Sequence, residues 1–122
     1  MSPKSLEKRA LHQGGGEREQ LLMSYSEELR SYLESHKRYP RKALVLGYSG
    51  RVVVHLVVRK DGHFKSLKLV EKSPHPSLNQ ATLATFQALG RFKPLPTALG
   101  RESQFLIPII YSLDGKSLQK GA

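Results

Sequence analysis

The hydrophobic positions between residues 17 and 37 recur at steps of three and four, which is the period of an amphipathic helix. Polar and charged residues fill the positions between them, and glutamates are enriched toward the N-terminal half. The series consists of Leu22, Tyr25, Leu29, Tyr32, Leu33 and His36. A helix of about five turns is therefore predicted. It should end near Lys37, because Pro40 disfavours the α conformation at the residue before it.

Two strands joined by a tight turn follow this helix. Residues 51–59 are nearly all β-branched and carry apolar side chains on both faces, which is typical of an interior strand. One face consists of Val52, Val54, Leu56 and Val58. The dipeptide Asp61-Gly62 is a strong signal for a hairpin turn. Residues 64–70 then form the returning strand, whose lysines are typical of a sheet edge.

A second helix and a third strand complete the pattern. Ser77 and Gln80 have the spacing of a capping box, and apolar positions within residues 78–89 predict the helix that Gly90 ends. Residues 104–113 carry apolar side chains at every second position, which predicts the last strand. The order of helix, strand, strand, helix and strand indicates a small α+β fold.

The connections between these elements determine the strand order. The hairpin strands are neighbours, and a right-handed helical crossover brings the third strand back parallel to the second. The doubly apolar first strand then lies between the other two. We therefore expect an antiparallel or mixed three-stranded sheet of order 2-1-3, with one helix packed on it and the third strand at an edge.

Glycine content and charge divide the chain into three regions. Residues 1–16 are expected to form a flexible tail, because the glycine triplet at 14–16 disfavours a helix. The amphipathic helix occupies residues 17–38, and residues 39–122 form the main domain. The chain has a formal net charge of +10, and residues 39–122 hold thirteen Lys and Arg against four Asp and Glu. Such a domain attracts anionic partners.

No catalytic or metal-binding pattern is present in the sequence. Cysteine is absent, and the five histidines lack the spacing of metal ligands. No pair of carboxylates indicates acid–base chemistry. We therefore expect a binding protein rather than an enzyme, with no catalytic residue, no metal and no cofactor.

The sequence also argues against membrane insertion and against binding of nucleic acids. No apolar run approaches the ~18 residues of a membrane span, and the N-terminus lacks the apolar region of a signal peptide. Single-stranded nucleic acids need exposed aromatic residues on a sheet, whereas the phenylalanines here fall at core positions. We expect no nucleic-acid partner, although a basic nucleic-acid-binding α+β module remains an alternative.

Short motifs between residues 39 and 113 resemble, in order and spacing, the TonB C-terminal domain. They are Tyr39-Pro40-x-x-Ala43, Gly50-x-Val52-x-Val54-x-Leu56-x-Val58, Asp61-Gly62-x-Phe64, Val70-x-x-Ser73, Leu78-Asn79-x-Ala81, Phe92-x-Pro94 and Pro108-Ile109-x-Tyr111-x-Leu113. The departures are mild: Asn79 stands where an acid is common, Pro74 where a second serine often follows, and Leu56 and Tyr111 replace a frequent phenylalanine.

The resemblance implies a periplasmic domain of a TonB-type energy transducer that is anchored in the inner membrane of a Gram-negative bacterium. In that family a transmembrane helix meets the ExbB–ExbD complex. The C-terminal domain binds the TonB box of outer-membrane receptors and transmits force for the uptake of iron chelates, vitamins or similar substrates. This chain would then be an excised domain or a stand-alone paralogue. An envelope adaptor with a TolA-like C-terminal domain remains an alternative function, and whether the domain forms a homodimer stays open.

The edge strand is the expected binding surface, through β-augmentation by an extended peptide. Alternate residues of a strand turn N–H and C=O to the same side, and proline is tolerated best where its missing N–H would face outward. Unless Pro108 marks a bulge, the even-numbered residues face the free edge. The predicted edge set is Gln104, Leu106, Pro108, Ile110 and Ser112. The resemblance adds a flanking set near the receptor: His36, Arg38, Tyr39, Pro40, Arg41 and Lys42.

Overall fold

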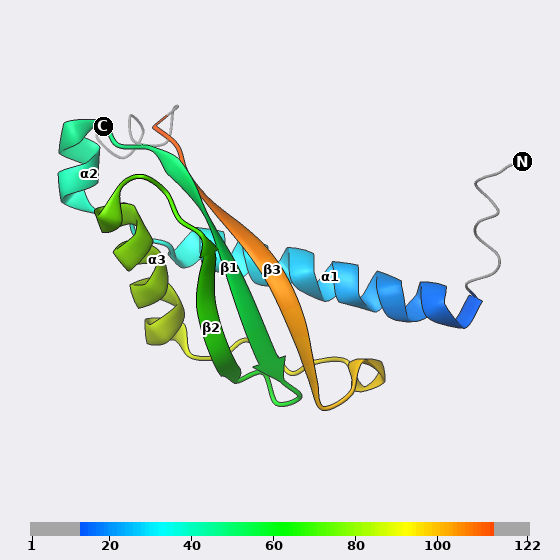
Figure 1. Ribbon diagram of the computed structural model, residues 1–122. Helices are drawn as coiled ribbons and strands as arrows, with labels where there is room; N and C mark the ends of the chain where they lie inside the picture. Colours follow the sequence, from blue (N-terminus) through cyan, green and yellow to red (C-terminus); the bar gives the residue numbers. More distant parts are fainter. Residues whose placement is uncertain (1–12, 114–122) are drawn as a thin grey trace, which may run out of the picture.

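The sheet has three strands, and helices cover one of its faces (Figure 1). A computed structural model describes residues 13–113. Its strands are β1 (Gly50–Arg59), β2 (Phe64–Glu71) and β3 (Glu102–Tyr111), in the order β2-β1-β3. β1 is antiparallel to both neighbours, so β2 and β3 run parallel to each other on either side of it. The predicted α+β fold, strand order and edge position of β3 are confirmed.

The core lies between the covered face of the sheet and the helices. The predicted apolar stripe of β1 is fully buried there, and β3 adds its odd-numbered side chains. The buried residues of the two strands include Val52, Val54, Leu56, Val58, Phe105, Ile107, Ile109 and Tyr111. Because each large apolar side chain contributes about 1.5–3 kcal/mol on burial, this alternation decides which face of each strand turns inward.

Helix α1 (Gln13–His36) lies behind β3 in the view of Figure 1 and contacts it. Tyr25, Leu29 and Leu33 are buried in the same core as the strands, while Leu22 is partly buried against it. The helix ends at His36, as the position of Pro40 predicts. The predicted apolar stripe of this helix therefore packs on the sheet domain of its own chain.

The start of α1 differs from the prediction. The helix begins at Gln13 rather than at residue 17, and it includes the glycine triplet at 14–16 that was expected to belong to a tail. Glycine costs about 1 kcal/mol in a helix, but each further residue adds a hydrogen bond to a helix that is already nucleated. Residues 1–12, the remainder of the predicted tail, lie outside the described residues.

Helices α2 (Arg41–Leu46) and α3 (Pro76–Leu89) follow α1 and β2 respectively. α2 is a short helix of six residues that buries Ala43. α3 packs against β1 and β2 and buries Leu78, Thr82 and Phe86. It therefore occupies the place on the sheet that the crossover connection requires.

The predicted capping box at the start of α3 is wrong. The N-cap is His75, which makes no side-chain capping bond, and the buried Ser77 Oγ has no hydrogen-bond partner among the described residues. Pro76 begins the helix because proline suits the first turn, where its missing N–H is not needed. Ser73 and Asn79 organise this corner instead, with the Ser73 N–H donating to Asn79 Oδ1 at 2.8 Å.

The hairpin turn between β1 and β2 is joined to the loop that follows α3. Gly62 has a φ of +95°, and the Phe92 N–H donates to its carbonyl oxygen at 3.0 Å. The loop continues through the buried Leu95 and the 3-10 helix η2 (Thr97–Leu99) into β3. This contact therefore holds the start of the loop that leads to β3 against the hairpin turn.

Candidate partner-binding edge

The two edge strands differ in how well each could accept a further strand. β2 pairs with β1 through two register shifts, and the Phe64 N–H at its start donates to the Gly90 carbonyl oxygen at 3.0 Å. The exposed Lys65 and Lys68 also protect this edge from pairing. β3 pairs with β1 over ten consecutive residues without a register shift. The outer side of β3 is therefore the more regular template for β-augmentation.

One backbone hydrogen bond shows which residues of β3 face outward. The Lys60 N–H donates to the Arg101 carbonyl oxygen at 2.7 Å, next to the opposed pair of Arg59 and Glu102. Hydrogen-bonded and non-hydrogen-bonded pairs alternate along an antiparallel ladder. The odd-numbered residues of β3 thus bond to β1, and the even-numbered residues turn their main-chain groups outward. Pro108 lies at an outward position, as the sequence predicted.

Burial alternates along β3: the odd-numbered side chains are buried in the core, and the even-numbered ones are exposed or half-buried on the opposite face of the sheet. Leu106 and Ile110 are 62% and 43% exposed, whereas Pro108 is half-buried. Gln104 Oε1 lies 2.9 Å from His55 Nε2 on β1. Ser112, the last of the set, follows the end of β3. A role for these residues in binding a partner stays a prediction.

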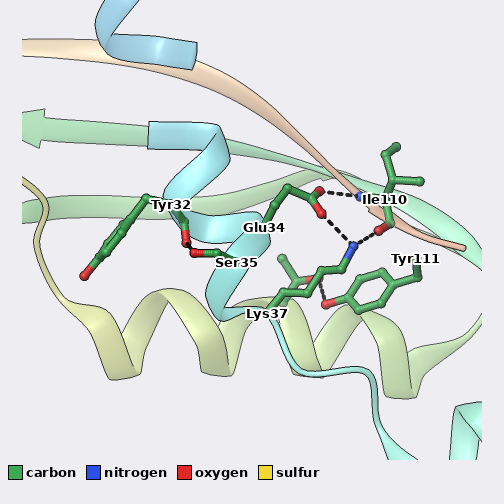
Figure 2. A network of polar contacts seen from close by, with 7 residues as sticks. Tyr32, Glu34, Ser35, Lys37, Ile110 and Tyr111 are labelled. Carbon is green, nitrogen blue, oxygen red and sulfur yellow. Dashed lines mark hydrogen bonds and ion pairs between the residues drawn. The ribbon is translucent and has the colours of Figure 1, made fainter. Parts of the chain in front are cut away.

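Ile110 already has hydrogen-bond partners on its outward side, one in the last turn of α1 and one directly after the helix ends (Figure 2). Its N–H donates to Glu34 Oε2 at 3.3 Å, and Lys37 Nζ donates to its carbonyl oxygen. Lys37 and Glu34 also form an ion pair of 2.7 Å. Two side chains at the end of α1 and directly after it thus take the place that a neighbouring strand would have at Ile110.

Sequence reasoning missed Glu34 and Lys37 as residues of this edge. Their three-residue spacing indicates an ion pair on a helix, and this signal is visible in the sequence. That the last turn of α1 lies beside β3 is a tertiary relationship, which no local pattern contains. The 8% exposure of the Lys37 side chain, whose Nζ lies 5.1 Å from the centre of the Tyr111 ring, reflects this packing.

The predicted flanking residues do not form one surface. Tyr39 alone packs at the end of β3, where its ring meets the Tyr111 ring edge-on at 5.4 Å between centres. Its hydroxyl donates to the Tyr48 carbonyl oxygen. Arg41 and Lys42 are exposed on α2.

The remaining flanking residues line a cavity between the end of α1 and α3. His36, Arg38 and Pro40 form one wall of this cavity, which has a volume of about 620 Å³. Its other wall consists of the α3 residues Ala81, Ala84, Thr85, Ala88 and Leu89. This part of the flanking set therefore lies beside α3, and a role for the flanking residues in binding a partner stays a prediction.

Two buried tyrosine hydroxyls connect the elements beneath the edge. Tyr111 Oη lies 2.9 Å from Thr82 Oγ1 on α3, and burial raises the pKa of Tyr111. Tyr25 Oη donates to the Lys93 carbonyl oxygen at 2.7 Å, and burial followed by the charge of Glu28 raises the pKa of Tyr25 to about 12. Both phenols are neutral at physiological pH and hold β3 and α1 in place.

Neither a metal centre nor a membrane span is found in residues 13–113. Within that range no three His, Asp or Glu side chains are placed to hold a metal ion. No helix there combines the length and apolar character that crossing a bilayer requires. The candidate site therefore remains the outer side of β3, where the main-chain groups of Gln104, Leu106 and Pro108 face outward in regular register.

Comparison with known proteins identifies the family. The family model described as Gram-negative bacterial TonB protein C-terminal matches residues 35–113. This chain belongs to that family. Protein TonB of Helicobacter pylori (strain J99) is 29% identical over 86 residues, which are 70% of this chain and 30% of that protein. Protein TonB of Haemophilus influenzae is 34% identical over 70 residues, which are 57% of this chain and 26% of that protein.

Solved structures of TonB C-terminal domains have the same fold. One NMR structure of the Helicobacter pylori TonB C-terminal domain matches with a TM-score of 0.59 and 30% identity, over 79% of this chain and 97% of that one. A longer form of the same domain matches with a TM-score of 0.60 and 30% identity, over 80% and 84% of the two chains. The chain spans about three tenths of the length of the curated Helicobacter relatives it matches.

Proposed function

We propose that this TonB C-terminal domain binds the TonB box of outer-membrane transporters by adding that segment to the sheet as a strand beside β3. The observation that carries the proposal is the regular ten-residue ladder of β3, whose outer side pairs with no strand of the described chain. Membership of the family supports the choice of partner. Main-chain hydrogen bonds would supply the affinity, and side-chain contacts would supply the specificity.

The side chains beside this edge indicate what the bound segment should contain. Leu106 and Ile110 project on the open face of the sheet, so alternate residues of an added strand would lie next to them. Apolar residues at those positions of the partner would bury this exposed surface. The basic residues Arg41 and Lys42 on α2 would attract an acidic surface of the receptor and accelerate its association with the domain.

The expected affinity suits a coupling that forms and releases repeatedly. About five backbone hydrogen bonds contribute ~0.5–1.5 kcal/mol each, and ordering of an extended peptide subtracts from that sum. With the apolar contacts included, a dissociation constant on the order of micromolar follows. Such a complex is held by many weak backbone hydrogen bonds and apolar contacts along the length of the added strand.

At the level of the whole protein, the domain would work in the periplasm as part of a TonB-type energy transducer. An inner-membrane anchor would couple it to the ExbB–ExbD complex, and the force it transmits would open a transporter for iron chelates, vitamins or similar substrates. This role requires no enzymatic activity, metal or cofactor of the domain. Membership of the TonB C-terminal family is the support for this part of the proposal.

The proposal is tested by titrating the isotope-labelled chain with synthetic peptides. The peptides copy the N-terminal periplasmic segments of outer-membrane transporters from the same genome, and a scrambled peptide is the control. We expect amide shifts confined to residues 102–112 and the last turn of α1, with the scrambled peptide inactive. Shifts along the outer side of β2 or in the cavity beside α3 would contradict the proposed site.

A further inference from the structure

The outward main-chain groups of Ile110 are not available to a partner strand in this structure. Glu34 Oε2 accepts from the Ile110 N–H, and Lys37 Nζ donates to the Ile110 carbonyl oxygen. Figure 2 shows the side chains of Glu34, in the last turn of α1, and of Lys37, directly after the helix, both reaching the same residue of β3. A partner strand that pairs along the whole edge would need the same two groups.

We propose that Glu34 and Lys37 form a latch that closes one end of the β3 edge, and that a partner strand opens the latch as it binds. This inference rests on the proposed function, because it concerns competition for the same edge. The latch is a side-chain substitute for a strand: a carboxylate replaces the partner's acceptor and an ammonium group replaces its donor. It also protects the edge from pairing with a second copy of the chain.

The contacts indicate how the latch can open without unfolding α1. The Glu34 bond to Ile110 is 3.3 Å long, beyond the common N–H···O distance, and the Glu34 side chain is 22% exposed. Lys37 is held more firmly, by the ion pair and by the ring of Tyr111. Rotation of the Glu34 side chain would release the Ile110 N–H first. The helix itself stays anchored by Leu29 and Leu33, which are fully buried.

The closed latch shortens the edge that a partner first meets. The outward N–H groups of Gln104 and Leu106 and the carbonyl oxygen of Pro108 precede Ile110 along β3. Pairing would therefore begin at residues 104–106 and extend to Ile110 only when the latch opens. The measured affinity is then lower than that of a permanently open edge, in proportion to the open fraction.

The test combines two variants of the latch with a matched control. Glu34→Ala removes the acceptor, whereas Glu34→Gln keeps an oxygen for the Ile110 N–H but loses the ion pair. The control is Glu27→Ala, which removes an ion pair of the same three-residue spacing to Arg30 about two turns earlier on α1. Glu27 is exposed, so the control leaves the edge unchanged.

The first readout is amide hydrogen exchange at Ile110 without any partner. We expect exchange about fivefold faster in Glu34→Ala than in the unmodified chain, in line with loss of one hydrogen bond. The Leu106 amide should exchange at the same rate in both proteins, and Glu34→Gln should lie between them. Equal Ile110 exchange in Glu34→Ala, Glu27→Ala and the unmodified chain would overturn the latch.

The second readout is affinity for the transporter peptides described above. Glu34→Ala should bind about fivefold more tightly, and Glu27→Ala should bind as the unmodified chain does. Unchanged or weaker binding by Glu34→Ala, with faster Ile110 exchange, would show that these contacts do not compete with the partner. Absence of peptide binding in every protein would instead overturn the proposed function, whereas the Ile110 exchange rates would still report whether Glu34 holds the edge.

Discussion

The carbonyl oxygen of Phe92 occupies the space where a side chain at Gly62 would begin. A Cβ at this position would lie 2.1 Å from that oxygen, and the backbone φ of +95° is one that other residues rarely adopt. Gly62→Ala should therefore reduce the free energy of unfolding by about 3 kcal/mol or more, which urea denaturation would measure. Gly47→Ala is the control, because Gly47 has a φ of +73° but no atom within 4 Å of such a Cβ. It should cost only about 1–2 kcal/mol, and equal losses would contradict the contact.

Proline substitutions distinguish the two sides of β3. Leu106→Pro deletes an outward N–H, so the fold should persist while affinity for a transporter peptide falls about tenfold. Ile107→Pro deletes an N–H that bonds to β1 and should unfold the sheet. Circular dichroism and peptide titration measure the two effects. Leu106→Ala separates loss of the side chain from loss of the N–H, and a reversed pattern for the two prolines would refute the register.

Alkaline pH should weaken the fold partly through Tyr25. Its pKa is about 12 in the folded chain, against ~10 in an unfolded one. The folded state therefore holds the phenol proton more tightly, and this stabilisation is fully present below pH ~10 and is lost as the pH rises toward 12. Tyr25→Phe should flatten the decline in unfolding free energy across that window. At neutral pH it should cost about 1 kcal/mol, the hydrogen bond to Lys93. An unchanged alkaline slope would contradict this.

The basic residues of α2, Arg41 and Lys42, should affect the association rate with a transporter rather than the dissociation rate. Reversing both charges, Arg41→Glu with Lys42→Glu, should slow association with a purified transporter about tenfold at low salt and leave the dissociation rate nearly unchanged. Stopped-flow mixing measures both rates. Lys68→Glu with Lys72→Glu, at exposed positions on and after β2, makes the same change in net charge. An equal effect of the two pairs would show general attraction instead of local steering.

Much of the sheet could be predicted because its signals are local. The alternation of Val52, Val54 and Leu56 specifies a buried face, and the rules for connections then leave one strand order. Pro108 specified the register of β3 because a proline cannot donate a hydrogen bond. These inferences require no knowledge of how distant segments pack.

The errors arose where neighbouring residues compete for the same capping position, or where tertiary packing determines which residues meet. Ser77 has the spacing of a capping residue, but Pro76 already begins the helix, and Ser73 with Asn79 supplies the polar contacts of that corner. The Glu34–Lys37 pair was visible as a helical pair, yet its bonds to Ile110 depend on where α1 crosses the sheet. The edge could therefore be predicted, whereas its latch could not.

The central claim is that an extended segment pairs with the outer side of β3. Amide hydrogen exchange at Gln104 and Leu106, measured with and without a saturating transporter peptide, tests it most directly. Both amides face outward, so pairing should slow their exchange about tenfold or more, while residues of β2 exchange as before. Protection on β2, or unchanged exchange at Gln104 and Leu106 in a complex shown to form, would contradict the account.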